Sequence, residues 1–343
     1  MSHIAAIVPE AKAPFQFQEV QTAQPGPHEI LIKNEAIGLI PIDAKLAKLA
    51  IFPIPYPAIL GSAYGGTVTA VGAEVSRFKV GDKVVAAKVI APPGDDKYKV
   101  FQEYIVAPDI TAGKVTSDAD LDVAVNLVGN LSTVISLINV VLGLDRPDPV
   151  ADASAKKGKK ILVYGGTSSF GSLTVQYLSQ AGYDVVTTTS PKHNDLVAKL
   201  GAVKVIDHTQ DRDDLLKALI AEGPYDFVID SISLPNTADI TAGVVAAQGG
   251  DKLWALLPPF GPETLPGGVV RDYRPWQSVL SEEENQELLA WAFNTYLPQA
   301  VANGRLVPLP TKVFTGGLKG LPEAVNVLIQ GVSGTKVIVK FDA

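Results

Sequence analysis

Hydrophobic residues near the N-terminus come in short runs that glycine and proline interrupt. The main runs are HEILIKNEAIGL, GGTVTAVG, GDKVVAAKV and FQEYIVA. Runs of this length between turn-forming residues are typical of strands, so residues 4–106 are predicted to form a small antiparallel barrel. The prolines of FPIPYP exclude a regular helix in that part of the chain.

The spacing of the hydrophobic residues changes near Asp118. In TSDADLDVAVNLVGNLSTVISLINVVLG the apolar positions recur three and four residues apart, which predicts one long helix that Ser117 or Asp118 caps. From residue 160 onward, short apolar strands alternate with helical segments: KILVY, SLTVQYLSQAG, DVVTTTS, NDLVAKLGA, KVIDH, DDLLKALIAEG and YDFVIDSI. This alternation predicts parallel βαβ units with right-handed crossovers and a sheet that is covered on both faces.

The chain ends in the type of sequence with which it began. After an irregular segment rich in proline and glycine, EEENQELLAWAFNTYL predicts an amphipathic helix, and the last forty or so residues return to a β-strand pattern that ends in TKVIVKF. We therefore predict an α/β protein of two domains. Residues 1–125, completed by residues 300–343, form the antiparallel barrel domain, and residues 126–299 form a doubly wound parallel-sheet domain.

The composition excludes several functional classes. The chain of 343 residues has 29 basic and 36 acidic residues, so a broad basic surface for nucleic acid is not expected. It has no cysteine, which excludes disulfides, thiolate metal sites and cysteine nucleophiles. The four histidines are scattered, so no metal site is predicted. No apolar stretch is long enough to cross a bilayer, and we expect a cytoplasmic protein with no membrane partner.

A glycine-rich turn separates the strand KILVY from the helix that follows it. It comprises Gly165, Gly166, Thr167, Ser168, Ser169, Phe170 and Gly171. Backbone N–H groups at such a junction, together with the N-terminus of the helix, form a site for a diphosphate, so these residues are predicted to bind a dinucleotide. Ser168 stands where the middle glycine of GxGxxG is often found. The alternative is that the turn is only a tight connection between strand and helix.

The residues after the next strand indicate which dinucleotide binds. An NAD site usually has an acidic residue there for the ribose 2′-hydroxyl, but this chain has Ser190, Pro191 and Lys192. A hydroxyl and an ammonium suit a 2′-phosphate, so NADPH is the predicted cofactor. His208, after the third strand, is placed near the same phosphate, or is a plain surface residue.

With these motifs the whole chain resembles the medium-chain dehydrogenase/reductase superfamily, in its zinc-free quinone-reductase-like branch and near the fungal trans-acting enoyl reductases. The resemblance rests on AIGLIPIDAK, YPAILGSAYGGTVTAVG, RFKVGDKV, NLST, LVYGGTSSFG and GLKGLPEAVNVLIQGVSGTKVIV. It implies a GroES-like barrel domain and a Rossmann domain. The ligand positions of zinc members are occupied here by Leu39, Ile40, Pro41, Ser62 and Ala63. The usual LNPxD and GxDxAG are LIPID and GSAYGG, so a polar Asn and an Asp are also missing.

The resemblance also implies roles for single residues. Lys45 follows LIPID and is the leading candidate to stabilise negative charge on a substrate oxygen, or else is a solvated helix lysine. Thr133 in NLST matches a threonine near the nicotinamide and the substrate carbonyl, or else bonds to local backbone. Tyr64 and Tyr56 are candidate proton donors, or else packing residues, and Asp43 is expected to be structural. Leu257 and Ser333, the latter with Lys336, complete the predicted cofactor contacts.

The expected activity is NADPH-dependent reduction of an activated C=C bond, in an enoyl thioester or an α,β-unsaturated carbonyl compound, in fungal secondary metabolism. The substrate is a small molecule, and a polyketide held by a carrier protein is one candidate. Quinone or carbonyl reduction on the same scaffold is the second interpretation, and a non-catalytic nucleotide-binding accessory protein is the third. A monomer is favoured over a homodimer, because the prolines of PFGPETLPGG remove hydrogen-bond donors from a sheet edge.

Overall fold

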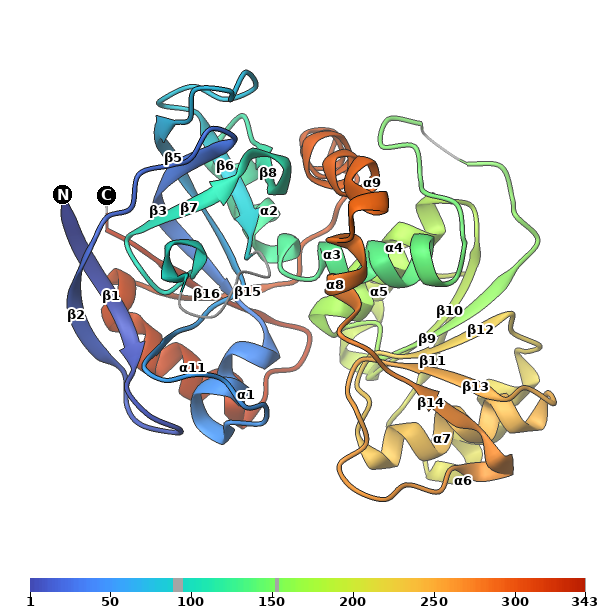
Figure 1. Ribbon diagram of the computed structural model, residues 1–343. Helices are drawn as coiled ribbons and strands as arrows, with labels where there is room; N and C mark the ends of the chain where they lie inside the picture. The colour runs from blue at the N-terminus through green and yellow to red at the C-terminus, as the bar shows by residue number, and fades with distance from the viewer. Residues whose placement is uncertain (89–94, 152–153, 343) are drawn as a thin grey trace. The chain divides into compact units, whose positions relative to one another are not determined.

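The computed structural model describes residues 1–88, 95–151 and 154–342. The chain forms two units (Figure 1). Unit 1 contains Met1–Ser132 and Ser281–Ala343, and unit 2 contains Thr133–Leu280. Unit 2 thus lies inside the range 126–299 that the sequence assigned to the parallel-sheet domain.

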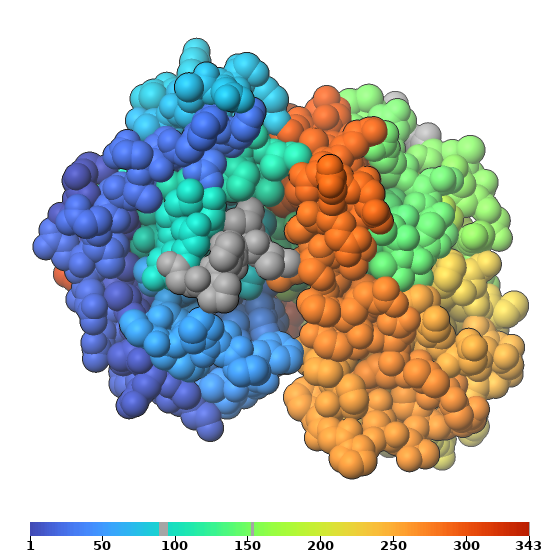
Figure 2. Space-filling model, in the orientation of Figure 1, coloured from blue at the N-terminus to red at the C-terminus, as the bar shows by residue number. Residues whose placement is uncertain are grey.

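Unit 1 is built on two sheets whose strand pairs are antiparallel, as its short hydrophobic runs predict, except that β15 and β16 pair in parallel. One sheet has the strand order β2-β1-β4, and the other has the order β15-β16-β3-β5-β6-β8, with β7 also paired to β3. The strands are β1 (Ser2–Val8), β2 (Gln16–Gln21), β3 (Glu29–Leu39), β4 (Ala58–Ile59), β5 (Ala63–Val71), β6 (Lys83–Ala87), β7 (Tyr104–Pro108), β8 (Ala112–Lys114), β15 (Thr311–Phe314) and β16 (Lys336–Lys340). The last strand, β16, pairs antiparallel with β3 in the larger sheet of unit 1. The residues of β2 are almost all exposed, and the N-terminal segment lies at the surface of unit 1 (dark blue in Figure 2).

The helices of unit 1 are α1 (Pro41–Leu49), α2 (Asp118–Val128), α9 (Gln286–Trp291), α10 (Leu297–Ala302) and α11 (Leu321–Gln330). In unit 1, α2 packs against β3, β5 and β6 of the larger sheet, α11 packs against β15 and β16, and α1 packs against α11. A Cβ atom added to Gly38 would lie 2.4 Å from the carbonyl oxygen of Val125, and one added to Gly65 would lie 2.5 Å from Cδ1 of Leu121. Only glycine in β3 and β5 therefore lets α2 approach the sheet this closely.

The long helix predicted from residue 118 is wrong, because the chain breaks after α2. It resumes as α3 (Leu131–Ile135) and continues as a π-helix, Ser136–Val141. Gly129 stands at the break, where an added Cβ would lie 3.0 Å from Cγ2 of Ile40. The periodicity of the apolar residues predicts the buried faces of α2 and α3, but it does not predict the turn between these helices. No single helix in the described ranges is long and apolar enough to cross a membrane, and only the bent pair Asp118–Val128 and Leu131–Val141 would be so by combined length and composition.

Unit 2 contains the predicted parallel sheet. Its strands are β9 (Lys160–Tyr164), β10 (Asp184–Thr189), β11 (Lys204–Asp207), β12 (Phe227–Asp230), β13 (Lys252–Ala255) and β14 (Val270–Asp272), in the order β11-β10-β9-β12-β13-β14. Its other helices are α4 (Ser169–Gln180), α5 (Asn194–Ala198), α6 (Arg212–Ala221), α7 (Pro235–Ala247) and α8 (Trp276–Leu280). Helices α6 and α7 lie together on one side of the sheet and α4 lies on the other (Figure 1). The predicted doubly wound fold is confirmed.

The strand order reverses between β9 and β12, since β9 pairs with β10 on one side and with β12 on the other. The carboxyl ends of these strands form the crevice in which open α/β sheets bind ligands. The glycine-rich turn follows β9 directly and therefore lies at this point. The segment around 260–272 was expected to be irregular, but it supplies β14 as an edge strand, in which Val270 is 63% exposed.

Candidate functional site

The glycine-rich turn after β9 is held by the neighbouring strand β10. The N–H of Gly165 donates to Oγ1 of Thr188 over 2.8 Å, and the N–H of Gly166 donates to the Thr188 carbonyl oxygen over 2.9 Å. Thr188 is fully buried. One threonine of β10 therefore fixes the path of the first two residues of the turn.

Both of these glycines are required by close packing. A Cβ on Gly166 would lie 2.3 Å from Oγ1 of Thr187, and Gly165 has a φ of +86°, where an added Cβ would lie 2.7 Å from Oγ of Ser231. The turn packs so closely against β10 and against the residue after β12 that only glycine fits at positions 165 and 166. The argument for an anion site therefore depends on the position of the turn and on its surroundings.

Ser168 explains the departure from GxGxxG, because it is the N-cap of α4. Its Oγ accepts a hydrogen bond from the N–H of Gly171 over 2.9 Å. The same Oγ lies 3.0 Å from Oγ of Ser231. The sequence pattern did not single out Ser231, since it comes 63 residues after Ser168. The capped N-terminus of a twelve-residue helix thus opens at the crevice.

The remaining turn residues lie where the sequence placed them. Phe170 is buried, so its side chain packs in the core and only its backbone is available to a ligand. Oγ1 of Thr167 lies 3.4 Å from Oγ1 of Thr189, the last residue of β10. Ser169 is the first residue of α4.

The residues predicted to bind a 2′-phosphate follow β10 and β11. Half-buried Ser190 precedes a 3-10 helix, Pro191–His193, in which Lys192 is exposed. His208 is exposed and follows β11. Its backbone N–H donates to the carbonyl oxygen of Thr189 over 3.1 Å. Since β10 and β11 are parallel neighbours, Ser190, Lys192 and His208 come together at the same edge of the sheet.

His193 belongs to this group, although no motif in the sequence indicates it. Its pKa is lowered first by partial burial and then by the charges of Lys192 and His208. The three side chains are therefore close enough to act on one another electrostatically. The feature of the sequence that could have indicated His193 is its position next to Lys192, which is predicted to bind the 2′-phosphate.

Leu257 and Ser333, both predicted to contact the cofactor, lie in different units. Half-buried Leu257 follows β13 in unit 2, and its carbonyl oxygen accepts a hydrogen bond from Nη1 of Arg271 over 3.1 Å. Ser333 is exposed in the loop before β16 in unit 1. Nothing in the geometry of either unit alone assigns these residues to a ligand.

In unit 1, Asp43 joins the motifs LIPID and GSAYGG by hydrogen bonds. Its Oδ2 accepts the N–H of Ile40 over 2.9 Å, and its Oδ1 accepts the hydroxyl of Ser62 over 2.5 Å. The carboxylate caps α1 and is 1% exposed. The structural role expected for Asp43 agrees with these bonds. Burial raises its pKa, against the charges of Lys88 and Lys336.

Lys45 and Thr133 are both half-buried. Lys45 lies one turn after the start of α1, and burial lowers the pKa of its ammonium. Thr133 lies in α3 and is the first residue of unit 2. Neither residue is fully enclosed in the core, so burial does not exclude the role predicted for it.

Tyr64 lies in the hydrophobic core of unit 1 and is 1% exposed. Burial raises the pKa of its phenol far above the ordinary value. A side chain in this position has no path for passing a proton to a bound substrate. The structure therefore favours the packing alternative for Tyr64 over the role of proton donor.

Lys336 is a second buried basic residue. It is 2% exposed, and among the residues that the structure describes its Nζ has no hydrogen-bond partner. Burial lowers its pKa to about 8, while Asp43 acts in the opposite direction. An ammonium without a hydrogen-bond partner is costly to bury, so we expect Lys336 to lower the stability of the fold.

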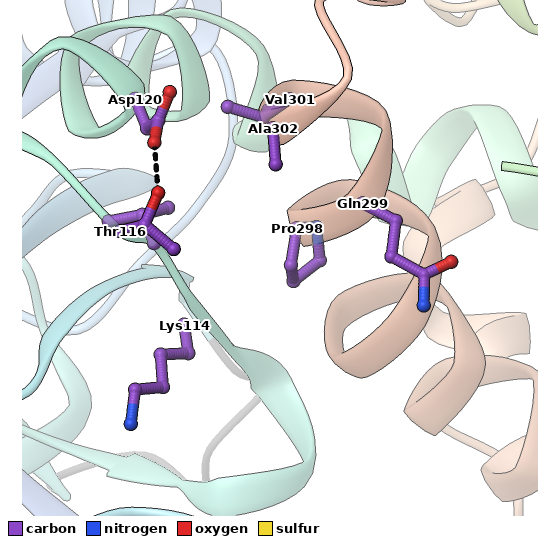
Figure 3. A pocket seen from close by; sticks show the side chains of 8 residues that line it. Lys114, Thr116, Asp120, Pro298, Gln299, Val301 and Ala302 are labelled. Carbon is purple, nitrogen blue, oxygen red and sulfur yellow. Dashed lines mark hydrogen bonds between the residues drawn. The ribbon is translucent and has the colours of Figure 1, made fainter. Parts of the chain in front are cut away.

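Within the described part of the chain, no group of three or more His, Asp or Glu side chains is placed to hold a metal ion. Unit 1 has a pocket of about 220 Å³ where α10 faces the segment between β8 and α2 (Figure 3). The pocket is lined by Lys114, Val115, Thr116, Asp120, Pro298, Gln299, Val301 and Ala302. Nζ of Lys114 is held by Asp82 at 2.8 Å, and Thr116 donates to Asp120 over 2.5 Å. None of the predicted site residues lines this pocket.

Comparison with known proteins identifies the family to which the chain belongs. Residues 26–116 match the alcohol dehydrogenase GroES-like domain family. Dehydrogenase azaJ of Aspergillus niger is 31% identical to the chain, over 98% of this chain and 99% of its own length. The trans-enoyl reductase himH of Aspergillus japonicus is 30% identical, over 91% of this chain and 89% of its own. Among solved structures, mycobacterial Rv1454c complexed with NADPH has a TM-score of 0.75 at 24% identity, with 98% of this chain and 99% of that chain covered. This chain is therefore an oxidoreductase of the medium-chain dehydrogenase/reductase family, and it belongs to the branch of the fungal enoyl reductases.

Proposed function

We propose that the protein is an NADPH-dependent reductase of activated C=C bonds, in enoyl thioesters or α,β-unsaturated carbonyl compounds of fungal secondary metabolism. The observation that carries this proposal is the glycine-rich turn at the switch point of the sheet, with Lys192 and His208 at the neighbouring strand ends. The name of the relative himH, a trans-enoyl reductase, supports the reaction, and the NADPH complex of Rv1454c supports the cofactor.

The turn fits a diphosphate at the first turn of α4. The N–H groups of Gly165 and Gly166 are hydrogen-bonded to Thr188 of β10, and that of Gly171 is hydrogen-bonded to Ser168, so these three glycines set the shape of the turn. The N-terminus of α4 and the hydroxyl of Thr167 would then hold the diphosphate. Ser190 and Lys192 would hold the 2′-phosphate, because no acidic side chain follows β10 directly.

When bound, the nicotinamide supplies a hydride to the electrophilic carbon of the substrate. Lys45 is the leading candidate to donate a hydrogen bond to the carbonyl oxygen, where negative charge develops, and the hydroxyl of Thr133 is a second candidate for contact with the substrate carbonyl. With Tyr64 in the core, the proposal takes the final proton from water. It needs no zinc, since Ile40, Ser62 and Ala63 stand at the ligand positions of zinc members. With no cysteine, folding needs no oxidising compartment, which fits a cytoplasmic location.

The direct test follows the absorbance of NADPH with an enoyl thioester, an α,β-unsaturated ketone and a quinone in parallel. Oxidation with either of the first two supports the proposal. Turnover with the quinone alone would instead favour quinone reduction, and NADPH binding without turnover would favour an accessory protein. Activity that a chelator abolishes and added zinc restores would contradict the metal-free mechanism. Comparison of a free thioester with the same acyl group on a carrier protein tests whether the substrate is carrier-bound.

The cofactor preference has its own test. Replacing Lys192 by Ala removes a full charge from the 2′-phosphate site and leaves the diphosphate site intact. We expect the Kd of NADPH to rise about tenfold or more, while the Kd of NADH changes little. Equal losses for both nucleotides would remove the reason to prefer NADPH. Light scattering during size exclusion tests the proposed monomer, and a dimer that mutation of β14 dissociates would overturn it.

A further inference from the structure

Arg271, on the edge strand β14, has a buried guanidinium that bonds to the loops after β12 and β13. Its side chain is 3% exposed. Nη1 donates to the carbonyl oxygen of Ser233 over 3.0 Å and to that of Leu257 over 3.1 Å. Nε donates to Oε2 of Glu263 over 2.8 Å, and Nη2 donates to Oε1 of the same carboxylate. One side chain therefore joins the loop after β12, the residue beyond β13 and the connection that leads to β14.

These contacts require the shape of an arginine. All three nitrogens of the guanidinium are engaged, and their N–H groups point in fixed directions within one plane. The carboxylate of Glu263 accepts two of the bonds side by side and balances the buried charge. A lysine at position 271 has a single nitrogen, so it cannot hold a carboxylate in this way and also bridge two carbonyl oxygens.

The loop after β12 is already held in a strained conformation. Asp230 and Ser233 are both fully buried, and Oδ1 of Asp230 accepts the N–H groups of Ile232 and Ser233 over 2.9 and 2.8 Å. Ser233 has a φ of +59°, in the left-handed region that side chains rarely adopt. Its Oγ accepts the N–H of Leu256 over 2.7 Å. The loops after β12 and β13 thus meet at Ser233, and the guanidinium fixes the same junction from β14.

This junction borders the crevice at the switch point of the sheet. A Cβ atom added to Gly165 would lie 2.7 Å from Oγ of Ser231 and 2.8 Å from Cγ1 of Ile232, so the loop after β12 packs against the glycine-rich turn. In the sheet, β10 and β11 lie on one side of β9, and β12 and β13 lie on the other. A dinucleotide with its diphosphate at the turn and its 2′-phosphate beyond β10 therefore extends its nicotinamide half over the ends of β12 and β13.

We propose that Arg271 is a positioning residue for the nicotinamide half of the cofactor, and that Glu263 acts through it. This inference rests on the proposed function and adds to it two residues that lie behind the loops of the crevice. The guanidinium keeps the loops after β12 and β13 in one relative position, and these loops support the nicotinamide and its ribose. The adenosine half lies on the far side of β9. Loss of the guanidinium should therefore affect the two halves of the cofactor differently.

The experiment compares the whole cofactor with its adenosine half. Calorimetry measures the Kd of NADPH and of 2′,5′-ADP, which has the adenosine and the 2′-phosphate but no nicotinamide. For Arg271→Met we expect the Kd of NADPH to rise about tenfold and kcat at saturating NADPH to fall about tenfold, because the nicotinamide is held less precisely. The Kd of 2′,5′-ADP should change by less than about twofold. A purely structural role would weaken both ligands together.

Two milder variants guard against a failure to fold. Burial raises the pKa of Asp230, and hydrogen bonds within the loop and then the charge of Arg271 oppose that rise, so Arg271→Lys keeps a positive charge that this carboxylate needs. It should show the same difference between the two ligands, because an ammonium does not replace the planar fork. Glu263→Gln keeps the length of its side chain and should raise the Kd of NADPH about threefold, again without affecting 2′,5′-ADP.

Arg274→Met is the matched control. Arg274 also follows β14 and pairs with a carboxylate, that of Asp272 at 3.3 Å, but its side chain is 48% exposed. We expect both Kd values and kcat to stay at their wild-type levels.

Unchanged NADPH binding and kcat in Arg271→Met and Arg271→Lys would overturn the inference. Equal weakening of NADPH and 2′,5′-ADP in Arg271→Lys, or in Glu263→Gln if neither arginine variant folds, would also overturn it. In all these cases NADPH turnover by the wild type would leave the proposed function intact. A wild type that binds neither ligand would overturn the proposed function and this inference with it.

Discussion

The hydroxyl oxygen of Ser231 lies 3.0 Å from that of Ser168, the residue that caps α4. Oγ of Ser231 also bonds to the carbonyl oxygen of Tyr164 at the end of β9. Its proton thus goes to the backbone, and a lone pair remains for the hydroxyl proton of Ser168. Through these bonds β12 holds the turn that is proposed to bind the cofactor.

Replacing Ser231 by Ala should weaken cofactor binding without changing the chemical step. The hydroxyl of Ser168 loses its partner and the turn loses its link to β12, which corresponds to about 1 kcal/mol. We therefore expect the Kd of NADPH to rise about fivefold while kcat at saturating NADPH stays near the wild-type value. Fluorescence titration and steady-state kinetics measure the two quantities.

Ser179→Ala is the control for this variant. Ser179 also makes one bond from a hydroxyl to a backbone carbonyl in unit 2, to Gly201 at 2.7 Å, but it lies at the other end of α4. It should leave the Kd of NADPH unchanged. If the two variants weaken NADPH equally, or if neither does, Ser231 has no positioning role.

Gly166→Ala should disable the turn more severely. The new methyl group would lie 2.3 Å from Oγ1 of Thr187 and 3.0 Å from its Cγ2. We expect NADPH binding to weaken by about a hundredfold, because the turn must shift to relieve this overlap. Thr187→Ala removes both clashing atoms, so the double variant should bind NADPH more tightly than Gly166→Ala alone. Strictly additive losses in this double-mutant cycle would contradict the packing argument.

The sequence pattern predicts the elements of unit 2 well, and the physical reason is visible in β9. Ile161, Leu162 and Val163 are all fully buried, as a strand covered on both faces requires, so an uninterrupted apolar run identifies it. The pattern fails at the break in the predicted long helix, next to Gly129, where Ile40 and Ala63 from distant segments leave little room for a side chain. Local spacing carries no information about such contacts.

The candidate site likewise contains some residues that local motifs predict and others that only contacts between distant segments bring into it. The turn at 165–171 and Lys192 follow from local motifs and could be named in advance. Ser231 and the electrostatic coupling of His193 to His208 could not, because strand order brings these residues together across the parallel sheet. Tyr64 was selected by its place in a motif, but β5 points this side chain into the core. Motifs thus select the candidate site, while burial and strand order determine which side chains are accessible at it.

Lys45 should affect turnover and not cofactor binding. If its ammonium stabilises the developing oxyanion, Lys45→Met should lower kcat by about a hundredfold and leave the Kd of NADPH unchanged. Burial lowers the pKa of Lys45, and the charged form is the active one, so wild-type kcat should fall as the pH rises through that lowered pKa. The alkaline limb should be absent from the pH profile of the variant.

Lys48→Met is the matched control for Lys45, because Lys48 lies on the same helix and is also half-buried. We expect it to keep both kcat and the alkaline limb. An equal loss in the two variants would indicate a general effect on α1. Full activity in Lys45→Met would return Lys45 to the alternative of a solvated helix lysine.

Lys336→Met should stabilise the protein at neutral pH. Below pH 8 the lysine is protonated in both the folded and the unfolded chain, so the folded chain bears the full cost of its buried ammonium. The shift from 10.5 to about 8 corresponds to about 3 kcal/mol, which is the upper bound on the gain in the free energy of unfolding. Between these two pH values the unfolded chain binds more protons, so wild-type stability rises with pH and the advantage of the variant shrinks.

Urea unfolding of both proteins at pH 7 and pH 10, followed by circular dichroism, measures this difference. Lys340→Met is the control on the same strand, because Lys340 is partly exposed and paired with Asp122 at 2.7 Å. That variant should lose less than about 1 kcal/mol, with no comparable dependence on pH. A loss of stability in Lys336→Met at pH 7 would mean that attraction between Lys336 and the buried carboxylate of Asp43 outweighs the desolvation of the ammonium. The two partners would then form a stabilising pair in the core of unit 1.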